Sequence, residues 1–330
     1  MPMIGLQEIR DARKAIKPFV VPTPLVRSQF LSNPCGGDVF LKLENLQVTN
    51  SFKIRGAFNR FLHLSLEEKA RGIVTASAGN HGQAVAFAAR KLNFPAKIVV
   101  PKNTPKIKIG GIKKYGVDLV LFGDIYDEAE QKAKDLAREE GLVFVSPYND
   151  ELIISGHGTI GLEIIDTLPN VDTVIVPVGG GCLISGISIA LKSIKPNVCV
   201  IGVQSEASPV MYESFKAGRI VDARMTESIA EGLSGGIEKD SVTFKIVQEY
   251  VDEVLLTSEE TIRRAVFLLW EFEKQVVEGS GAAAIAPLIE KKRVFAGKTV
   301  VAVITGGNIE AELFRSILAS ERCRQQAYLG

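Results

Sequence analysis

A lysine lies where a helix is predicted to begin, in the segment TNSFKIRGAFNR at residues 49–60. Apolar residues recur at helical spacing after Lys53, and three residues before it are candidates for the N-cap: Thr49, Asn50 and Ser51. The start of a helix carries partial positive charge, and residues 45–66 include no acid to balance another cation. These surroundings favour the neutral amine, which forms Schiff bases and removes protons. Lys53 is therefore a candidate nucleophile or base, and the alternative is a solvated surface lysine.

Three turns that contain glycine follow predicted strands and offer free backbone N–H groups. The first is TASAGNH at residues 75–81, the second lies within VIVPVGGGCLISG at residues 174–186, and the third within VVAVITGGNIE at residues 300–310. Unpaired N–H groups at a helix start bind anions, and consecutive glycines let a phosphate approach the backbone closely. Thr305 adds a hydroxyl beside the glycines of the third turn. For the first turn taken alone, a simple helix cap is the alternative.

The common nucleotide-binding motifs do not fit the second turn. Glu206 follows it at about the interval expected for a ribose-binding acid, but Ile184 stands where the dinucleotide motif needs its third glycine. No Gly-Lys-Ser or Gly-Lys-Thr follows the glycines, which excludes a Walker A loop. The remaining features suit a cofactor with one phosphate, a lysine partner and a ring in a pocket lined by hydroxyl groups. Pyridoxal 5'-phosphate has these properties.

The chain closely resembles the fold type II pyridoxal phosphate enzymes, and among them the threonine (serine) dehydratases and the related serine racemases. The resemblance rests on six ordered motifs: TPLVRS, LKLENLQVTNSFKIRGA, SAGNHGQAVA, PVGGGCLISG, VVEGSGAAA and ITGGN. It implies a two-lobed α/β fold like that of the tryptophan synthase β chain, with parallel sheets flanked by helices. It also implies ammonia-lyase activity and assembly as a homodimer or homotetramer.

The resemblance also implies roles for individual residues. Lys53 is expected to hold pyridoxal phosphate covalently and to act as the catalytic base, with Phe52 flanking the cofactor ring. Asn80 is expected to bind the phenolic oxygen of the cofactor, and Thr305 its ring nitrogen. One segment is expected to bind the phosphate: Gly179, Gly180, Gly181, Cys182 and Leu183. Another is expected to bind the substrate carboxylate: Ser77, Ala78, Gly79, Asn80 and His81.

Three departures from the family pattern refine these expectations. Cys182 replaces the fourth glycine of the usual phosphate loop, where its backbone N–H still serves as a donor. Gln204 and Val210 stand where serine racemases have carboxylates that bind a divalent metal, so we expect no divalent metal site. A monovalent ion bound by carbonyl groups is compatible with the sequence. Ala78 replaces the serine that acts in serine racemases as the second acid/base. We therefore expect elimination to be much faster than racemisation.

The overall composition is that of a globular protein that acts on a small molecule. The chain has 330 residues, 46% of them hydrophobic and 23% charged, and a formal net charge of +1. We expect no nucleic-acid face and no membrane span, because the basic excess is small and no apolar run is long enough. The cysteines and histidines lack the spacing of a zinc site, so we expect reduced thiols and no metal. The charged N-terminus lacks a signal core, which predicts a cytoplasmic protein.

The elements that must position these residues alternate along the chain. From residue 38 onward, short β-rich runs alternate with amphipathic stretches, which predicts βαβ units and parallel sheets. One helix is predicted from about Asn80 to Leu92, and turn residues gather near residues 66–72 and 146–150. We therefore expect a large cofactor-binding domain at residues 1–66 and 147–330, and a small, mobile domain at residues 67–146 that gates the substrate.

These features predict dehydration and deamination of L-threonine, L-serine or both, with Lys53 removing the Cα proton. A hydroxyl such as Thr305 stabilises a protonated ring less well than a carboxylate, which favours elimination, because the β-hydroxyl departs as the proton is removed. The alternatives are a serine racemase, a dehydratase of another β-hydroxy amino acid such as 3-hydroxyaspartate or phenylserine, and a cofactor-binding protein without catalysis. The motifs leave the pocket for the β-substituent open, so they do not rank threonine against serine.

Overall fold

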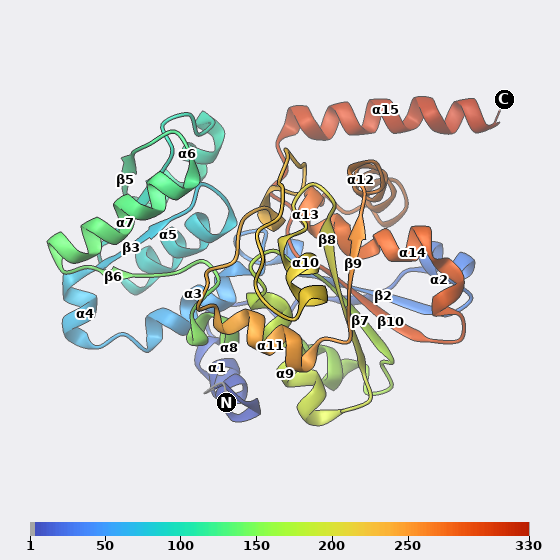
Figure 1. Cartoon of the computed structure of the whole chain (residues 1–330), viewed down its shortest axis with the longest axis horizontal. Helices are drawn as coiled ribbons and strands as arrows, with labels where there is room; N and C mark the ends of the chain where they lie inside the picture. The colour runs from blue at the N-terminus through green and yellow to red at the C-terminus, as the bar shows by residue number, and fades with distance from the viewer. Residues whose placement is uncertain (1–3, 330) are drawn as a thin grey trace.

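The computed structural model describes the backbone of residues 4–329 and the side chains of residues 4–322. Two sheets organise the chain, and they lie in separate lobes (Figure 1). The larger sheet has the order β1-β2-β10-β7-β8-β9, and the smaller has the order β5-β4-β3-β6. The strands are β1 (Leu25–Arg27), β2 (Asp38–Leu43), β3 (Ile73–Ala76), β4 (Ala96–Val100), β5 (Asp118–Leu121), β6 (Val143–Phe144), β7 (Thr173–Pro177), β8 (Cys199–Ser205), β9 (Glu253–Thr257) and β10 (Thr299–Ile304).

Every strand pair is parallel except β1 with β2, so the predicted parallel sheets are confirmed with one antiparallel edge strand. The helices are α1 (Leu6–Ile16), α2 (Gln29–Cys35), α3 (Lys53–Leu62), α4 (Leu66–Arg71), α5 (Asn80–Leu92), α6 (Lys106–Lys113), α7 (Tyr126–Glu140), α8 (Glu151–Thr167), α9 (Cys182–Ile194), α10 (Val210–Ala217), α11 (Val242–Tyr250), α12 (Glu259–Glu273), α13 (Gly279–Ala282), α14 (Ala286–Glu290) and α15 (Ala311–Leu329). Four short 3-10 turns complete the fold: η1 (Glu44–Leu46), η2 (Glu231–Leu233), η3 (Ala283–Ile285) and η4 (Lys292–Phe295).

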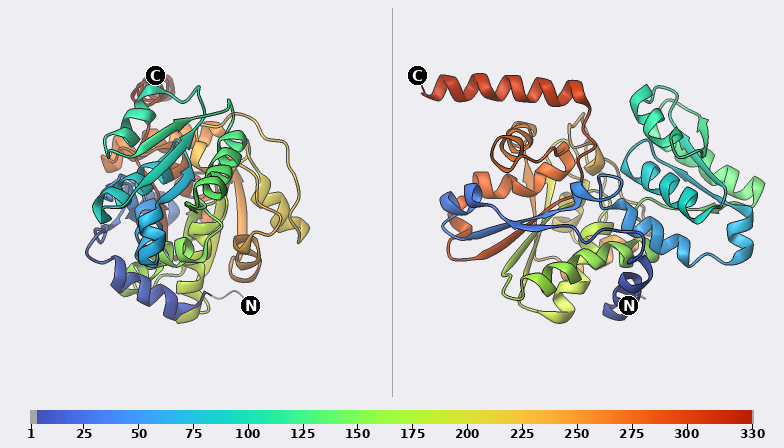
Figure 2. Two further views of the ribbon diagram at one scale, coloured as in Figure 1. Left: turned by 90° about the vertical axis from the view of Figure 1, so that its left-hand side faces the viewer. Right: turned by 180° about the vertical axis from the view of Figure 1, so that it is seen from behind.

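Helices cover both faces of the larger sheet, with α8, α9 and α11 on one side and α12 to α14 on the other (Figure 1). Strand β10 shows why both faces must be covered. Its side chains alternate between two apolar cores, with Val301 and Val303 in one and Val300, Ala302 and Ile304 in the other. Helix α15 extends across the larger lobe, away from the smaller one, as the right-hand view of Figure 2 shows.

The smaller sheet is formed by a continuous part of the chain. Its strands all fall between Ile73 and Phe144, and α5, α6 and α7 pack on them. The chain enters this lobe through α4, which ends at Gly72 in a left-handed conformation with φ of +94°. Strand β6, at the edge of this sheet, has only two residues.

Helix α8 brings the starts of α3 and α9 close together. A Cβ at Gly156 would lie 2.6 Å from the carbonyl oxygen of Arg55 on α3, and a Cβ at Gly186 on α9 would lie 2.3 Å from the carbonyl oxygen of Ile154. Side chains at these two positions would force the helix backbones apart. The small residues of GHG and ISG therefore allow α3, α8 and α9 to pack as one layer, with the starts of α3 and α9 adjacent.

Candidate active site

The amine of Lys53 lies between the start of α3 and the start of α9. Its Nζ donates to the carbonyl oxygen of Pro147 at 2.8 Å and lies 3.8 Å from Sγ of Cys182. It also lies 5.2 Å from the centroid of the Phe52 ring. Among the side chains at residues 4–322, no carboxylate is within ion-pair distance of this amine. Lys53 is thus positioned by a carbonyl group and lacks a carboxylate partner.

The local start of α3 differs from the sequence prediction. None of Thr49, Asn50 and Ser51 caps the helix, because Phe52 is the N-cap residue and no side chain bonds to the first turn. Instead the N–H of Phe52 donates to the carbonyl oxygen of Thr305 at 3.1 Å, and Ser51 pairs with Gly306 in an isolated bridge. A long-range backbone contact with the end of β10 replaces the expected local cap.

Arg55 does not add free positive charge beside Lys53. Its buried guanidinium pairs with Glu44 at 2.8 Å and with Glu163 at 2.6 Å. Glu163 also accepts from Nζ of Lys42 at 2.5 Å. Burial alone would raise the pKa of Glu44, but the charge and hydrogen bonds of Arg55 outweigh it and hold the pKa below the usual range. The predicted excess of cations at the helix start is therefore neutralised by residues distant in sequence.

The second glycine turn connects β7 to α9 and forms a cradle of backbone groups. Gly181 has φ of +88°, which turns the chain into the first helical residue, Cys182. A Cβ at Gly180 would lie 2.5 Å from the ring of Tyr148, so only glycine leaves space beneath that ring. No side chain caps α9, and its first N–H groups have no partner within the helix. This turn fits a phosphate group close to Lys53.

The third turn, which follows β10, lies beside Asn80 of the first turn. Thr305 directly follows β10 and is buried. Asn80 is the first residue of α5, and its Nδ2 would lie 3.2 Å from a Cβ at Gly306. The same Nδ2 donates to Oε1 of Glu278 at 2.6 Å, while Nδ2 of Asn308 donates to Oδ1 of Asn80 at 2.7 Å. The predicted ligands Asn80 and Thr305 thus come from different lobes and meet at the end of β10.

The first turn follows β3 at the edge of the smaller lobe. The hydroxyl of Ser77 accepts from the N–H of Gly79 at 3.2 Å, and Ala78 packs against the apolar core of this lobe. His81 is different, because its ring is buried and both ring nitrogens lack a partner. Burial and the charge of Lys53 lower the pKa of His81 to about 3, so the imidazole is neutral. In this turn Gly79 is exposed, Ser77, Ala78 and Asn80 are partly buried, and His81 is buried.

His157 is a buried residue that the sequence did not single out for this site. It lies on α8, its ring meets the edge of Phe52 with centroids 4.7 Å apart, and both of its ring nitrogens lack a partner. A Cβ at Gly56 would lie 2.6 Å from its Nε2, so glycine at that position makes room for the ring. Burial and the nearby charge of Lys53 hold the pKa of His157 well below the usual range. His157 therefore supports Phe52 as a neutral aromatic ring.

Four further residues near Lys53 were not assigned a role from sequence: Pro147, Tyr148, Glu278 and Asn308. Glu278 and Asn308 fall within the quoted motifs VVEGSGAAA and ITGGN, so the motifs point to these residues without giving either a role. Pro147 and Tyr148 fall in the predicted seam at residues 146–150 and were visible there only as turn residues. Their roles depend on contacts across the fold.

The positions expected to lack a divalent metal have other partners. Oε1 of Gln204 accepts from the N–H of Tyr212 at 3.0 Å, and Val210 begins α10. Within the described residues, no cluster of three or more His, Cys, Asp or Glu side chains is arranged to hold a metal ion. Cys35, Cys182 and Cys199 are free thiols, and the side chain of Cys323 lies outside the described residues. No helix between residues 4 and 329 is both long and apolar enough to cross a membrane.

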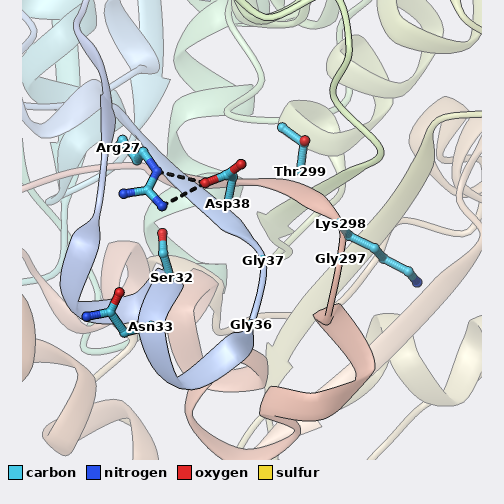
Figure 3. A pocket seen from close by; sticks show the side chains of 9 residues that line it. All are labelled: Arg27, Ser32, Asn33, Gly36, Gly37, Asp38, Gly297, Lys298 and Thr299. Carbon is cyan, nitrogen blue, oxygen red and sulfur yellow. Dashed lines mark hydrogen bonds and ion pairs between the residues drawn. The ribbon is translucent and has the colours of Figure 1, made fainter.

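A hollow of about 410 Å³ lies elsewhere on the larger lobe (Figure 3). It is located where β2 and β10 begin, and an ion pair between Arg27 and Asp38 crosses one side of it. In parallel sheets, ligands bind beyond the carboxyl ends of the strands. The three glycine turns follow the carboxyl ends of β3, β7 and β10, so the strand directions favour the region around Lys53 over this hollow.

Comparison with known proteins identifies the family of this chain. Residues 16–306 match the family model described as pyridoxal-phosphate dependent enzyme. An L-threonine ammonia-lyase of Thermotoga maritima is 46% identical over 316 residues, which cover 96% of this chain and 78% of that protein. A catabolic L-threonine dehydratase of Staphylococcus aureus is 44% identical over 93% of this chain and 90% of its own length. The structure of maize serine racemase superposes with a TM-score of 0.90 at 32% identity, covering 99% of both chains.

Proposed function

Because this chain belongs to the pyridoxal-phosphate dependent enzymes, we propose that it removes water and ammonia from L-threonine, L-serine or both. The products are 2-oxobutanoate from threonine and pyruvate from serine, together with ammonia. One observation supports this proposal above the others. The amine of Lys53 lies 3.8 Å from the first residue of α9, where the glycine turn provides a cradle for phosphate. This short distance supports a site in which Lys53 reacts and the glycine turn binds an anion.

Pyridoxal phosphate, when bound, withdraws electrons from the amino acid and makes its Cα proton removable. Lys53 would hold the cofactor, with Phe52 against its ring, and residues 179–183 would bind its phosphate through backbone N–H groups. Thr305 would meet the ring nitrogen and Asn80 the phenolic oxygen. Backbone groups of residues 77–81 would bind the substrate carboxylate, because this turn leads into the start of α5. The imidazole of His81 would not take part, because it is buried.

Lys53 then removes the Cα proton of the bound amino acid. The β-hydroxyl gains a proton and leaves as water, and a double bond forms between Cα and Cβ. After release, the unsaturated amine is hydrolysed to the 2-oxo acid and ammonia. The carbonyl oxygen of Pro147 accepts a hydrogen bond from the Lys53 amine and carries no net charge. The neutral rings of His81 and His157 likewise bring no charge to this region.

Racemisation is the second candidate, because the structure of maize serine racemase superposes closely on this chain. A racemase needs a proton donor on the face of the cofactor opposite the lysine. Ala78 has no acidic group, and at the end of a strand the adjacent side chain of Ser77 is expected to point to the opposite side. These two residues favour elimination over racemisation.

We also propose that residues 67–146 form a small domain that closes over the substrate, against a large domain of residues 1–66 and 147–330. Lys108 on α6 supports this division, because it pairs with Glu231 at 2.5 Å and Glu310 at 3.5 Å on the larger lobe. A hollow of about 440 Å³ separates the lobes beside Phe144 and Glu238. We further propose a cytoplasmic homodimer or homotetramer, as the resemblance implies, which light scattering after size-exclusion chromatography tests.

Reduction with borohydride followed by peptide mapping tests the cofactor assignment. We expect the purified protein to be yellow and a pyridoxyl group to be fixed on Lys53, and label found on another residue would overturn the assignment. A panel of β-hydroxy amino acids, assayed for 2-oxo acid release, then tests the reaction. We expect turnover of threonine or serine to persist in EDTA and to disappear in Lys53→Ala. Binding of cofactor with no turnover of any panel member would favour a binding protein, and interconversion of L- and D-serine as fast as pyruvate release would favour a racemase.

A further inference from the structure

The side chain of Asn80 is held by two partners that together determine the direction of its amide. Its Nδ2 donates to Oε1 of Glu278 at 2.6 Å, and its Oδ1 accepts from Nδ2 of Asn308 at 2.7 Å. The oxygen and nitrogen of an asparagine have nearly the same shape, so contacts rather than packing decide which way the amide faces. Each partner of Asn80 bonds only one end of it.

The orientation of Asn308 is determined in turn by the backbone. Its Nδ2 also donates to the carbonyl oxygen of Thr49 at 3.0 Å, and its Oδ1 accepts from Nδ2 of Asn50 at 3.3 Å. A carbonyl oxygen only accepts, so the amide nitrogen of Asn308 must face Thr49. Asn308 consequently presents a donor to Asn80, and the oxygen of Asn80 must face it.

Glu278 acts on the other end of the same amide. A carboxylate only accepts, and a protonated carboxyl group still has one accepting oxygen. Glu278 therefore draws the nitrogen of Asn80 toward itself. Asn80 has two N–H bonds on this nitrogen, and among the described residues Glu278 is the only acceptor that one of them meets. One N–H stays free for an acceptor on a bound molecule.

We propose that Glu278 and Asn308 are positioning residues that hold the Asn80 amide with one N–H directed to an anionic oxygen of the bound cofactor. This inference rests on the proposed function, in which Asn80 binds the phenolic oxygen of pyridoxal phosphate. If the amide turned over, its oxygen would face that anionic oxygen and repel it. The network joins residues 49–50, which precede Lys53, to the start of α5 in the smaller lobe.

A double-mutant cycle separates positioning from a general structural role. The single variants are Glu278→Ala, Asn308→Ala and Asn80→Ala. The two double variants combine Asn80→Ala with Glu278→Ala and with Asn308→Ala. The readouts are the concentration of pyridoxal phosphate that half-saturates the resolved enzyme, the rate of cofactor release from the holoenzyme and the absorbance maximum. We expect each single substitution to weaken cofactor binding about tenfold or more, the effect of losing one good hydrogen bond to a charged group.

In the Asn80→Ala background, we expect Glu278→Ala and Asn308→Ala to change binding less than about twofold, because their target is gone. Equal losses in both backgrounds would show a structural role and overturn the proposal. Asn308→Asp keeps the shape but replaces the donor by an acceptor, so it must bind the cofactor at least as weakly as Asn308→Ala. Tighter binding by Asn308→Asp would also overturn it. This variant keeps the test open if an alanine variant does not fold.

The outcome for the unmodified protein distinguishes this inference from the proposed function. If the unmodified protein does not bind pyridoxal phosphate at Lys53, the proposed function fails. If it does and Asn80→Ala binds the cofactor equally well, only the positioning inference fails. A matched control is Glu310→Ala, since Glu310 follows Asn308 by two residues but contacts Lys108 instead of Asn80. We expect this control to leave the absorbance maximum unchanged.

Discussion

Nζ of Lys53 and Sγ of Cys182 lie 3.8 Å apart, although 129 positions separate the two residues in the chain. The amine begins α3 and the thiol begins α9, and α8 packs against both helices. The thiol replaces a glycine of the family pattern, so this chain has a sulfur atom beside its reactive amine. That contact allows the site to be tested by chemical modification of the thiol.

Methylthiolation of Cys182 should inactivate the enzyme, because the added group occupies space beside Lys53. We expect methyl methanethiosulfonate to reduce activity at least about tenfold, because the added group blocks access to the catalytic base. Inactivation should be slower when pyridoxal phosphate is in excess. Activity is expressed relative to each protein before treatment. Cys182→Ser should resist the reagent, whereas Cys35→Ser should stay sensitive. Equal inactivation of Cys182→Ser would assign the effect to another thiol.

Ala78→Ser should introduce racemisation of serine. The substitution places a hydroxyl at the position that holds an acid/base in serine racemases, and positioned proton donors contribute about 100-fold or more. We expect D-serine formation, measured by chiral chromatography, to rise at least about tenfold over the unmodified protein. Ala78→Gly is the matched control and should form none above background. A protein that already racemises serine without the substitution would contradict the role given to Ala78.

Lys108→Met should weaken closure of the smaller lobe. Lys108 is the residue of α6 that pairs with Glu231 and Glu310 on the larger lobe. Partly exposed ion pairs are worth about 1 kcal/mol or less, so we expect KM for the amino acid to rise by about two- to fivefold. Hydrogen exchange of α6 should become faster in the same variant. Lys106→Met, on the same helix and exposed, should leave both measurements unchanged. A similar effect in this control would argue against a specific role of the Lys108 ion pairs in closure.

Arg55→Met should strongly destabilise the protein. The substitution leaves Glu44 buried without its partner, and breaking a buried ion pair in this way costs about 3–5 kcal/mol. Urea unfolding of the cofactor-free protein measures the change. Adding Glu44→Gln should recover part of the lost stability, because the unpaired buried charge of Glu44 is then removed. A loss below about 1 kcal/mol for Arg55→Met would show that solvent reaches Glu44.

Glu278→Gln should change how stability depends on pH. Burial raises the pKa of Glu278 to about 7, with Glu231 adding to the rise, while Asn80, the backbone of Asn308 and Lys108 oppose it. The folded protein therefore holds a proton more tightly than the unfolded chain, whose glutamate titrates at about 4.3. Stability from this group is present below about pH 4 and is lost as pH rises through about 7. Glu278→Gln has no such loss.

Thermal unfolding at pH 5 and pH 8 tests this expectation in the cofactor-free protein. The melting temperature of Glu278→Gln relative to the unmodified protein should rise between these two pH values. A difference that is constant with pH, or that falls toward pH 8, would mean that Glu278 is ionised at ordinary pH. Glu310→Gln serves as the control, because Glu310 is a partly exposed carboxylate that pairs with Lys108 rather than with Asn80.

Local sequence patterns determined the secondary structure and the types of chemical group at this site. The helix predicted from about Asn80 to Leu92 is confirmed at both ends, since periodicity and turn residues act over a few positions. Alternation of strands and helices correctly predicted the parallel sheets, because a parallel pair requires a crossover. The glycine turns stood out as candidate anion sites because a backbone cradle is formed by consecutive residues.

The tertiary structure decided which groups meet and what charge they carry. The acid-free stretch at residues 45–66 suggested unbalanced cations, yet Glu163 approaches Arg55 from α8, 108 positions away. His157 reaches Phe52, and Asn308 reaches Asn80, for the same reason: helix and strand packing brings distant residues together. No periodicity in the sequence encodes these pairings, because the partners belong to elements that are distant in the chain. The sequence predicted Lys53 and the glycine turns as the candidate site, and the packing of α3, α8 and α9 decided the neighbours of Lys53.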